Sequence, residues 1–193
     1  KTIHLSKKVQ SSGISTIDVS NGTGSGILVV NASQYSVSTD LTFIGSDDKD
    51  VNVNFTGGSG NDTFTTGKIT EDAGDTLTGG QGEDTFNIIA TGQAAVITDL
   101  GVGGPDALIV NSSAKGVTAT VTVDYVADTR TSNTNTTLSA VVLNAARNVD
   151  INMVKASGTH GYVINGGAAA SKLEGSNFGD SITGNARVDT LIG

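Results

Sequence analysis

The feature that most constrains the fold is a nine-residue pattern that occurs twice. Residues 57–65 read GGSGNDTFT and residues 79–87 read GGQGEDTFN, so both fit G-G-x-G-x-D-x-U-x, where U is a large apolar residue. The glycines let the chain turn tightly and aim carbonyl oxygens inward, and the aspartate adds a charged oxygen. Oxygen ligands of this kind suit calcium. The last three residues make a minimal strand whose one apolar side chain enters a core. Both copies therefore predict short strands joined by cation-binding turns.

The composition favours a thin, repetitive β-structure. The 193 residues include 26 Gly, one Pro, no Cys, no Trp, five Phe and three Tyr. So few aromatic residues cannot fill a thick core, while the many Thr, Val, Ile and Ser residues favour strands over helices. The absence of cysteine from the sequence excludes disulfides and thiolate metal sites.

Short apolar or β-branched runs alternate with turns rich in Gly, Asn, Ser and Asp. The predicted strands include residues 16–19, 27–30, 41–44, 51–55, 63–65, 76–78 and 85–89. Their spacing of about ten residues is too short for an intervening helix but suits a solenoid, in which each strand stacks on the one two turns back. We therefore expect an all-β parallel β-helix or β-roll solenoid with calcium-binding glycine-rich turns and a less regular β insertion.

A solenoid of this kind divides the glycine-rich turns between two edges. Residues 45–50 and 67–75 fall on one edge, and residues 57–62 and 79–84 on the other. This alternation predicts that Asp50 lies near Asp75 and that Asp62 lies near Asp84, so that each pair can share an ion. Stacked carboxylates repel one another without a cation, and the energy of binding a cation would then become folding energy.

We expect three parts along the chain. Residues 1–110 form the solenoid with calcium-binding turns, residues 111–147 an irregular β segment or small sandwich-like insertion, and residues 148–193 the start of a second solenoid stretch. Within the middle part, strands are predicted at residues 117–126 and 138–143, with an exposed hairpin loop at residues 127–137. The last part carries degenerate copies of the nonapeptide, GSNFGDSIT at 175–183 and GNARVDTLI at 184–192. Gly193 would open a further copy, which leads us to expect a module from a longer, repetitive protein.

These nonapeptides resemble the RTX (repeats-in-toxin) calcium-binding repeats of proteins exported by Gram-negative bacteria. The segment from Ile97 to Leu108 resembles the strand-turn-strand element that often follows such repeats, and together the matches cover about a third of the chain. In that family, backbone carbonyls and the closing aspartates of alternate turns bind calcium inside a parallel β-roll. The chain departs from the family pattern in its 22-residue step from Gly57 to Gly79, where 18 is ideal, and in Asn185 and Ala186 of the last copy.

The resemblance implies a set of calcium ligands. The two strong copies contribute Asp62 and Asp84, with backbone oxygens near Gly57, Ser59, Gly60, Gly79, Gln81 and Gly82. The element that follows them adds Asp99 and Asp106. The alternation of turns adds Asp50 and Asp75, and the degenerate copies add Asp180 and Asp189.

The formal net charge of −8 is concentrated where the glycine turns are. Residues 45–106 carry eleven acids against two lysines, which is −9 and leaves +1 for the remainder. Either cation binding or a solvated acidic face explains this, and the recurrence of acids at turn ends favours cation binding. The chain has no basic patch, which argues against nucleic acid, and no apolar run of about 18 residues that could span a bilayer.

The sequence does not favour an enzyme. It has neither an H-E-x-x-H zinc helix nor a G-x-S-x-G nucleophile turn. Its only histidines are His4 and His160, and a lone histidine between loop glycines is usually just a polar residue at the surface. Asp47 and Asp48 could do acid–base work, but metal ligation or solvation suits a glycine turn better.

Two functions from different classes remain. The first is a calcium-stabilised structural module of a secreted surface-layer or adhesin-like protein, with calcium ions and neighbouring modules or copies as partners. The alternative is an accessory calcium-binding segment of a type I-secreted enzyme or toxin. Both place the protein outside a Gram-negative cell. Residues 1–8 lack the apolar stretch of a secretory signal, so we expect export to be directed from elsewhere.

Overall fold

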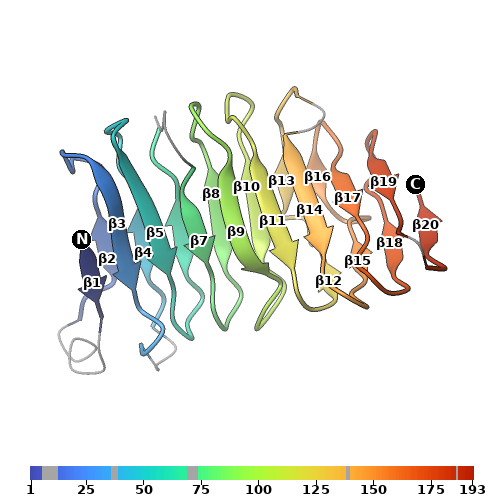
Figure 1. Cartoon of the computed structure of the whole chain (residues 1–193), viewed down its shortest axis with the longest axis horizontal. Coiled ribbons are helices and arrows are strands. Elements are labelled where there is room, and N and C mark those ends of the chain that lie inside the picture. Colours follow the sequence, from blue (N-terminus) through green and yellow to red (C-terminus); the bar gives the residue numbers. More distant parts are fainter. Residues whose placement is uncertain (6–12, 36–38, 69–73, 138–139, 186) are drawn as a thin grey trace.

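The computed structural model describes residues 1–5, 13–35, 39–68, 74–137, 140–185 and 187–193. These residues form a parallel β-solenoid of about eight coils, with strands side by side along the long axis of the molecule (Figure 1). The predicted fold class is confirmed. The part of the chain described contains no helix, and hence none long and apolar enough to cross a membrane.

The strands belong to three sheets, in which every hydrogen-bonded pair is parallel. Sheet A runs β1 (Thr2–His4), β3 (Gly26–Asn31), β5 (Val51–Thr56), β7 (Thr76–Thr78), β9 (Ala95–Leu100), β11 (Val117–Val121), β14 (Val141–Ala145), β17 (Val163–Asn165) and β19 (Ser181–Thr183). Sheet B runs β2 (Thr16–Asp18), β4 (Thr42–Ile44), β6 (Thr63–Thr65), β8 (Thr85–Ile88), β10 (Ala107–Val110), β13 (Ser132–Asn133) and β16 (Ser157–Gly158). Sheet C runs β12 (Tyr125–Val126), β15 (Ile151–Asn152), β18 (Lys172–Glu174) and β20 (Thr190–Ile192).

Side-chain alternation explains why these short segments form strands. In β5 the residues Val51, Val53 and Phe55 are buried, while the residues between them face outward. The three-residue strands β4, β6 and β7 each bury only their central residue. Because side chains in a strand point alternately to opposite faces, one apolar residue per strand is enough to line a thin core. All seven strands predicted for residues 16–89 are present.

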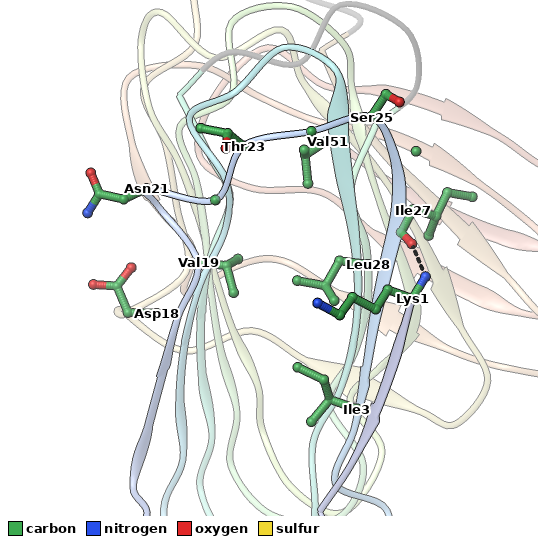
Figure 2. Close-up of a pocket in the computed structure, with 13 residues that line it drawn as sticks. Lys1, Ile3, Asp18, Val19, Asn21, Thr23, Ser25, Ile27, Leu28 and Val51 are labelled. Atoms are coloured by element: carbon green, nitrogen blue, oxygen red, sulfur yellow. Dashed lines mark hydrogen bonds between the residues drawn. The ribbon is translucent and has the colours of Figure 1, made fainter.

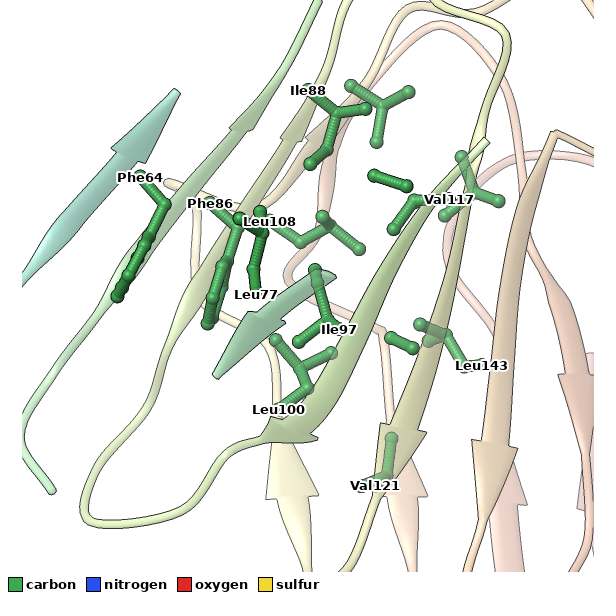
Figure 3. Close-up of a cluster of buried hydrophobic side chains, with 14 of the residues drawn as sticks. Phe64, Leu77, Phe86, Ile88, Ile97, Leu100, Leu108, Val117, Val121 and Leu143 are labelled. Atoms are coloured by element: carbon green, nitrogen blue, oxygen red, sulfur yellow. The ribbon is translucent and has the colours of Figure 1, made fainter. Parts of the chain in front are cut away.

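The core is a stack of side chains that repeats from coil to coil. Phe43, Phe64 and Phe86 occupy equivalent places in β4, β6 and β8, with ring centroids 4.8 Å and 5.2 Å apart. Leu108 follows in register on β10, and Leu77 and Ile97 pair opposite them in sheet A (Figure 3). Parallel stacking of identical residues therefore replaces a thick core, as the composition predicts.

The structure of residues 111–147 differs from the insertion that the sequence predicts. Strands β11 and β14 pair with each other and with strands on either side of them in sheet A, and β13 pairs with β10 and β16 in sheet B. Residues 111–147 therefore continue the solenoid instead of forming a sandwich-like insertion. The predicted exposed hairpin at 127–137 is also wrong, because Thr131, Asn133 and Asn135 are buried. Residues 138–139, part of one predicted strand, lie outside the described residues.

Candidate metal centre

The aspartates that end the glycine-rich turns, which we call the closing aspartates, hold adjacent coils together through hydrogen bonds from backbone N–H groups. Asp62 Oδ1 accepts from the N–H of Leu41 in the preceding coil at 2.8 Å, and its Oδ2 accepts from the N–H of Gly58 in its own turn at 2.7 Å. Asp106 repeats this arrangement with the N–H groups of Asp84 at 2.9 Å and Gly101 at 2.6 Å. One carboxylate thus caps its own turn and ties it to the coil before it.

The same double acceptance recurs elsewhere on the solenoid. Asp75 accepts from the N–H groups of Val53 and Gly67, Asp180 from those of Tyr162 and Ser176, and Asp189 from those of Ser171 and Asn185. The degenerate nonapeptides therefore keep the capping aspartate even where the glycines are lost. Asp75 and Asp180 precede strands of sheet A, on the opposite edge from Asp62, while Asp189 precedes β20 of sheet C.

Three buried aspartates stack on that edge, and we call Asp62, Asp84 and Asp106 the acid column. The N–H of Asp62 donates to Asp84 Oδ1 at 2.7 Å, and the N–H of Asp84 donates to Asp106 Oδ1 at 2.9 Å. All three side chains are buried. The proximity of Asp62 to Asp84 that the alternating turns predict is therefore found, and Asp106 extends it by one coil.

Asp84 differs from its neighbours because one of its oxygens has no partner. Its Oδ2 is buried and forms no hydrogen bond. In the preceding turn, Gly58 supplies the matching N–H to Asp62; in this turn, Gly80 has a φ of 102° and its N–H donates instead to Asp99 Oδ2 at 2.9 Å. A buried polar atom left unpaired is costly, which marks this oxygen as a candidate ligand.

Asp99 reaches this turn because of a β-bulge. Strand β9 pairs Ile97 with Ala119 and Leu100 with Val121, so two residues of β9 stand opposite one residue of β11. A bulge re-aims a side chain that regular pairing would leave on the sheet surface. The Asp99 carboxylate accepts from the N–H groups of Gly79 at 2.8 Å and Gly80 at 2.9 Å.

Burial makes the negative charge of these carboxylates expensive. It raises the pKa of Asp62 to about 6, that of Asp106 to about 7 and that of Asp84 to about 8. Repulsion from Asp106, Asp62 and Asp99 adds to the rise at Asp84. Burial also raises the pKa of Asp99. At neutral pH, protonation or a bound cation would therefore stabilise these four carboxylates in the folded chain.

The oxygen atoms at this edge are the kind of ligand that a hard cation prefers, but they do not form a complete coordination shell. All the groups involved are oxygens, and a carboxylate that accepts one N–H keeps lone pairs for a metal. However, in the described part of the chain no three Asp, Glu, His or Cys side chains converge on a point that could hold a metal ion. An ion here would be held by Asp84 with a column neighbour, and backbone carbonyls would complete its shell.

The glycines that the sequence singles out permit the coils to approach closely. A methyl group at Gly57 would clash with Asp62 Oδ2 and with the carbonyl oxygen of Gly79. At Gly60 it would meet the carbonyl of Thr39, and at Gly82 that of Gly60. The glycines thus make room for oxygen atoms at this edge.

The remaining predicted ligands are placed differently. The Ser59 hydroxyl donates to the carbonyl of Tyr35 at 3.3 Å, while the N–H of Gln81 donates to the carbonyl of Gly58 at 3.1 Å. The predicted pairing of Asp50 with Asp75 is wrong: Asn54 pairs with Thr76, which puts Asp75 level with Val53, and Asp50 forms an ion pair with Lys49. Part of the 67–75 turn, residues 69–73, lies outside the described residues.

Two sequence signals could have located this site more closely. The acid column has a spacing of 22 residues, from Asp62 to Asp84 to Asp106. The bulge is visible as a break in the alternation of apolar residues, because Ile97 is followed by apolar Leu100 and position 99 is an aspartate.

A cavity of about 500 Å³ opens at the N-terminal end of the solenoid, away from the acid column. Apolar side chains of Ile3, Val19, Ile27 and Leu28 line it, together with the polar residues Lys1, Asp18 and Asn21 (Figure 2). None of the acid column is among its lining residues in the described structure. The cavity and the candidate metal centre are separate features.

Comparison of the chain with protein-family models, with curated proteins and with solved structures finds no match.

Proposed function

We propose that this chain is a calcium-binding structural module of a secreted bacterial cell-surface protein, such as a surface layer or an adhesin. The observation that carries the proposal is the buried, unpartnered Oδ2 of Asp84 among three other carboxylates. A solenoid supplies a suitable frame, because each coil contacts only its neighbours and a tie between turns stiffens the array.

The chain's own residues explain how calcium would act. A bound calcium ion would supply positive charge where burial makes the negative charge of the carboxylates unfavourable. Asp62, Asp84 and Asp106 belong to successive coils, so neutralising their repulsion favours the stacked arrangement. The backbone N–H groups already fix each carboxylate in place, which reduces the ordering needed for binding.

Calorimetric calcium titration and thermal unfolding of the 193-residue chain test the proposal. We expect wild type to bind calcium and to unfold at a higher temperature in millimolar calcium than in chelator. The variant Asp84→Asn should bind at least about tenfold more weakly, since it removes one buried charged ligand. In chelator it should be as stable as wild type or more stable, because the repulsion is gone.

Asp124→Asn is the matched control. Asp124 is an exposed aspartate. Its Oδ1 accepts the N–H of Asp150 in the next coil at 2.9 Å, much as Asp84 Oδ1 accepts that of Asp62 in the preceding coil. This variant should keep the calcium response of wild type. A wild type that neither binds calcium nor gains stability from it would contradict the proposal, and so would an Asp84→Asn variant with unchanged affinity.

A further inference from the structure

Arg130 lies at the C-terminal end of the acid column and contacts three successive turns. Its Nε donates to Asp128 Oδ2 at 2.7 Å within its own turn. Its Nη2 donates to the carbonyl of Pro105 at 2.7 Å in the preceding turn and to Glu83 Oε2 at 3.3 Å in the turn before that. Pro105 and Glu83 are the immediate neighbours of Asp106 and Asp84. The guanidinium therefore bridges the turns that carry two members of the column.

The column stops being acidic at this coil. The N–H of Asp106 donates to the carbonyl of Gly104 in its own turn at 3.0 Å, whereas those of Asp62 and Asp84 each donate to an aspartate of the next coil. The N–H of Leu108 donates to the hydroxyl of Thr131 at 3.3 Å. The Tyr125 hydroxyl donates to the carbonyl of Asp106 at 2.9 Å and lies 3.0 Å from the Thr131 hydroxyl. The acceptor for the N–H of Asp106 is thus a carbonyl and not a carboxylate, while Arg130 supplies a positive charge on the outside of the same turns.

The other ion pairs of the described chain are elsewhere. Lys49 and Lys68 pair with Asp50 and Asp47 on the opposite edge, and Lys172 pairs with Glu174 in sheet C. Arg130, in contrast, forms its ion pairs with Glu83 and Asp128 on the edge of the acid column. An arginine suits this role, because its planar fork can serve several acceptors at once and it keeps its charge at every relevant pH.

We propose that Arg130 is a built-in cation that closes the acid column. It holds the turns at residues 79–84, 101–106 and 127–131 together when no metal is bound, and it marks the coil at which the calcium requirement of the solenoid ends. The idea that Arg130 does in the metal-free chain what calcium does elsewhere rests on the proposed function. The bridging of the three turns by Arg130, which we call the clamp, rests only on the contacts of Arg130.

Hydrogen exchange of backbone amides in chelator and in millimolar calcium tests the inference on the 193-residue chain. The informative amides are those of Asp84, Gly101 and Ala107, which donate to groups of the column turns. In chelator, Arg130→Gln should exchange at these amides roughly three to ten times faster than wild type. Calcium should remove most of this difference. Arg130→Lys, which keeps the charge but loses the fork, should fall in between.

Arg147→Gln removes an exposed arginine from the turn before β15 and serves as the control, with exchange as in wild type under both conditions. Unchanged exchange of Arg130→Gln in chelator would overturn the clamp, whatever calcium does. If wild type itself responds to calcium, an equal acceleration of the variant in chelator and in calcium would also overturn the proposal, since Arg130 would then be a tie unrelated to the column. If Arg130→Gln exchanges faster than wild type in chelator and the exchange of wild type is the same with and without calcium, the role of Arg130 would be supported and the proposed function would be contradicted.

Discussion

At the scale of single residues, the aspartates that close the turns, with the exception of Asp84, each have a local partner and a distant one. Asp62 caps the N–H of Gly58 four residues before it and the N–H of Leu41 in the preceding coil. The glycines beside it are needed because oxygen atoms occupy the space of a side chain. Glycine and aspartate therefore act as one unit, in which removing either partner disturbs the other.

Gly57→Ala tests this dependence. Its methyl group would displace both Asp62 Oδ2 and the carbonyl of Gly79, so we expect the free energy of unfolding to fall by about 2 kcal/mol or more. Gly179→Ala is the matched control, since nothing lies within 4 Å of its added methyl group, and its effect should stay within about 0.5 kcal/mol. Urea unfolding of both variants measures the difference. Equal effects would show that the close approach at Gly57 does not constrain the fold.

At the scale of elements, the acid column behaves as a unit because its members share hydrogen bonds and repel one another. The charged groups that face Asp84 are Asp62, Asp99 and Asp106, with Arg130 acting on Asp106 from outside. Each carboxylate has a folded-state pKa above its ordinary value, so the folded chain binds protons more tightly than the unfolded chain.

The stability of the calcium-free chain should therefore fall as pH rises. The contribution of these groups is complete below a pH of about 4 and is lost as the pH passes the folded-state pKa values of about 6 for Asp62, about 7 for Asp106 and about 8 for Asp84. Urea unfolding in chelator should show a loss on the order of a few kcal/mol between pH 5 and pH 8.5. Asp84→Asn should flatten this slope. Stability that rises with pH over this range would contradict the electrostatic account.

At the scale of the whole molecule, the solenoid is uniform in backbone pairing and uneven in charge. Sheet A extends from β1 to β19, yet the excess negative charge is confined to residues 45–106. In an array where each coil contacts its neighbours, stability can differ from coil to coil. The self-association expected from the sequence stays a prediction.

Chelation should therefore loosen residues 45–106 before the coils that follow. We expect hydrogen exchange to accelerate in β6 and β8 when calcium is removed, while β14 and β17 stay protected. Mass spectrometry of peptides from both regions measures this directly. The same sample in calcium provides the reference. Identical protection of residues 45–106 with and without chelator would remove the calcium account, although the solenoid itself would stand.

The sequence by itself determined the local structure of this chain. Glycine-rich turns and single apolar residues such as Phe64 and Phe86 specify short strands, because turn geometry and side-chain alternation depend on adjacent residues. The closing aspartates were likewise visible, since residues such as Asp62 and Asp106 cap a turn within a few residues of themselves.

Only the tertiary structure decided which residues stand level in neighbouring coils. Thr16 pairs with Thr42, Thr42 with Thr63 and Thr63 with Thr85, whereas Val163 pairs with Ser181, so the separation between paired residues varies, from 26 for the first of these pairs to 18 for the last. Register depends on the whole path of each coil and not on any local motif. That is why the pairing of Asp50 with Asp75 was wrong and why the placement of Arg130 against Glu83 could not be foreseen.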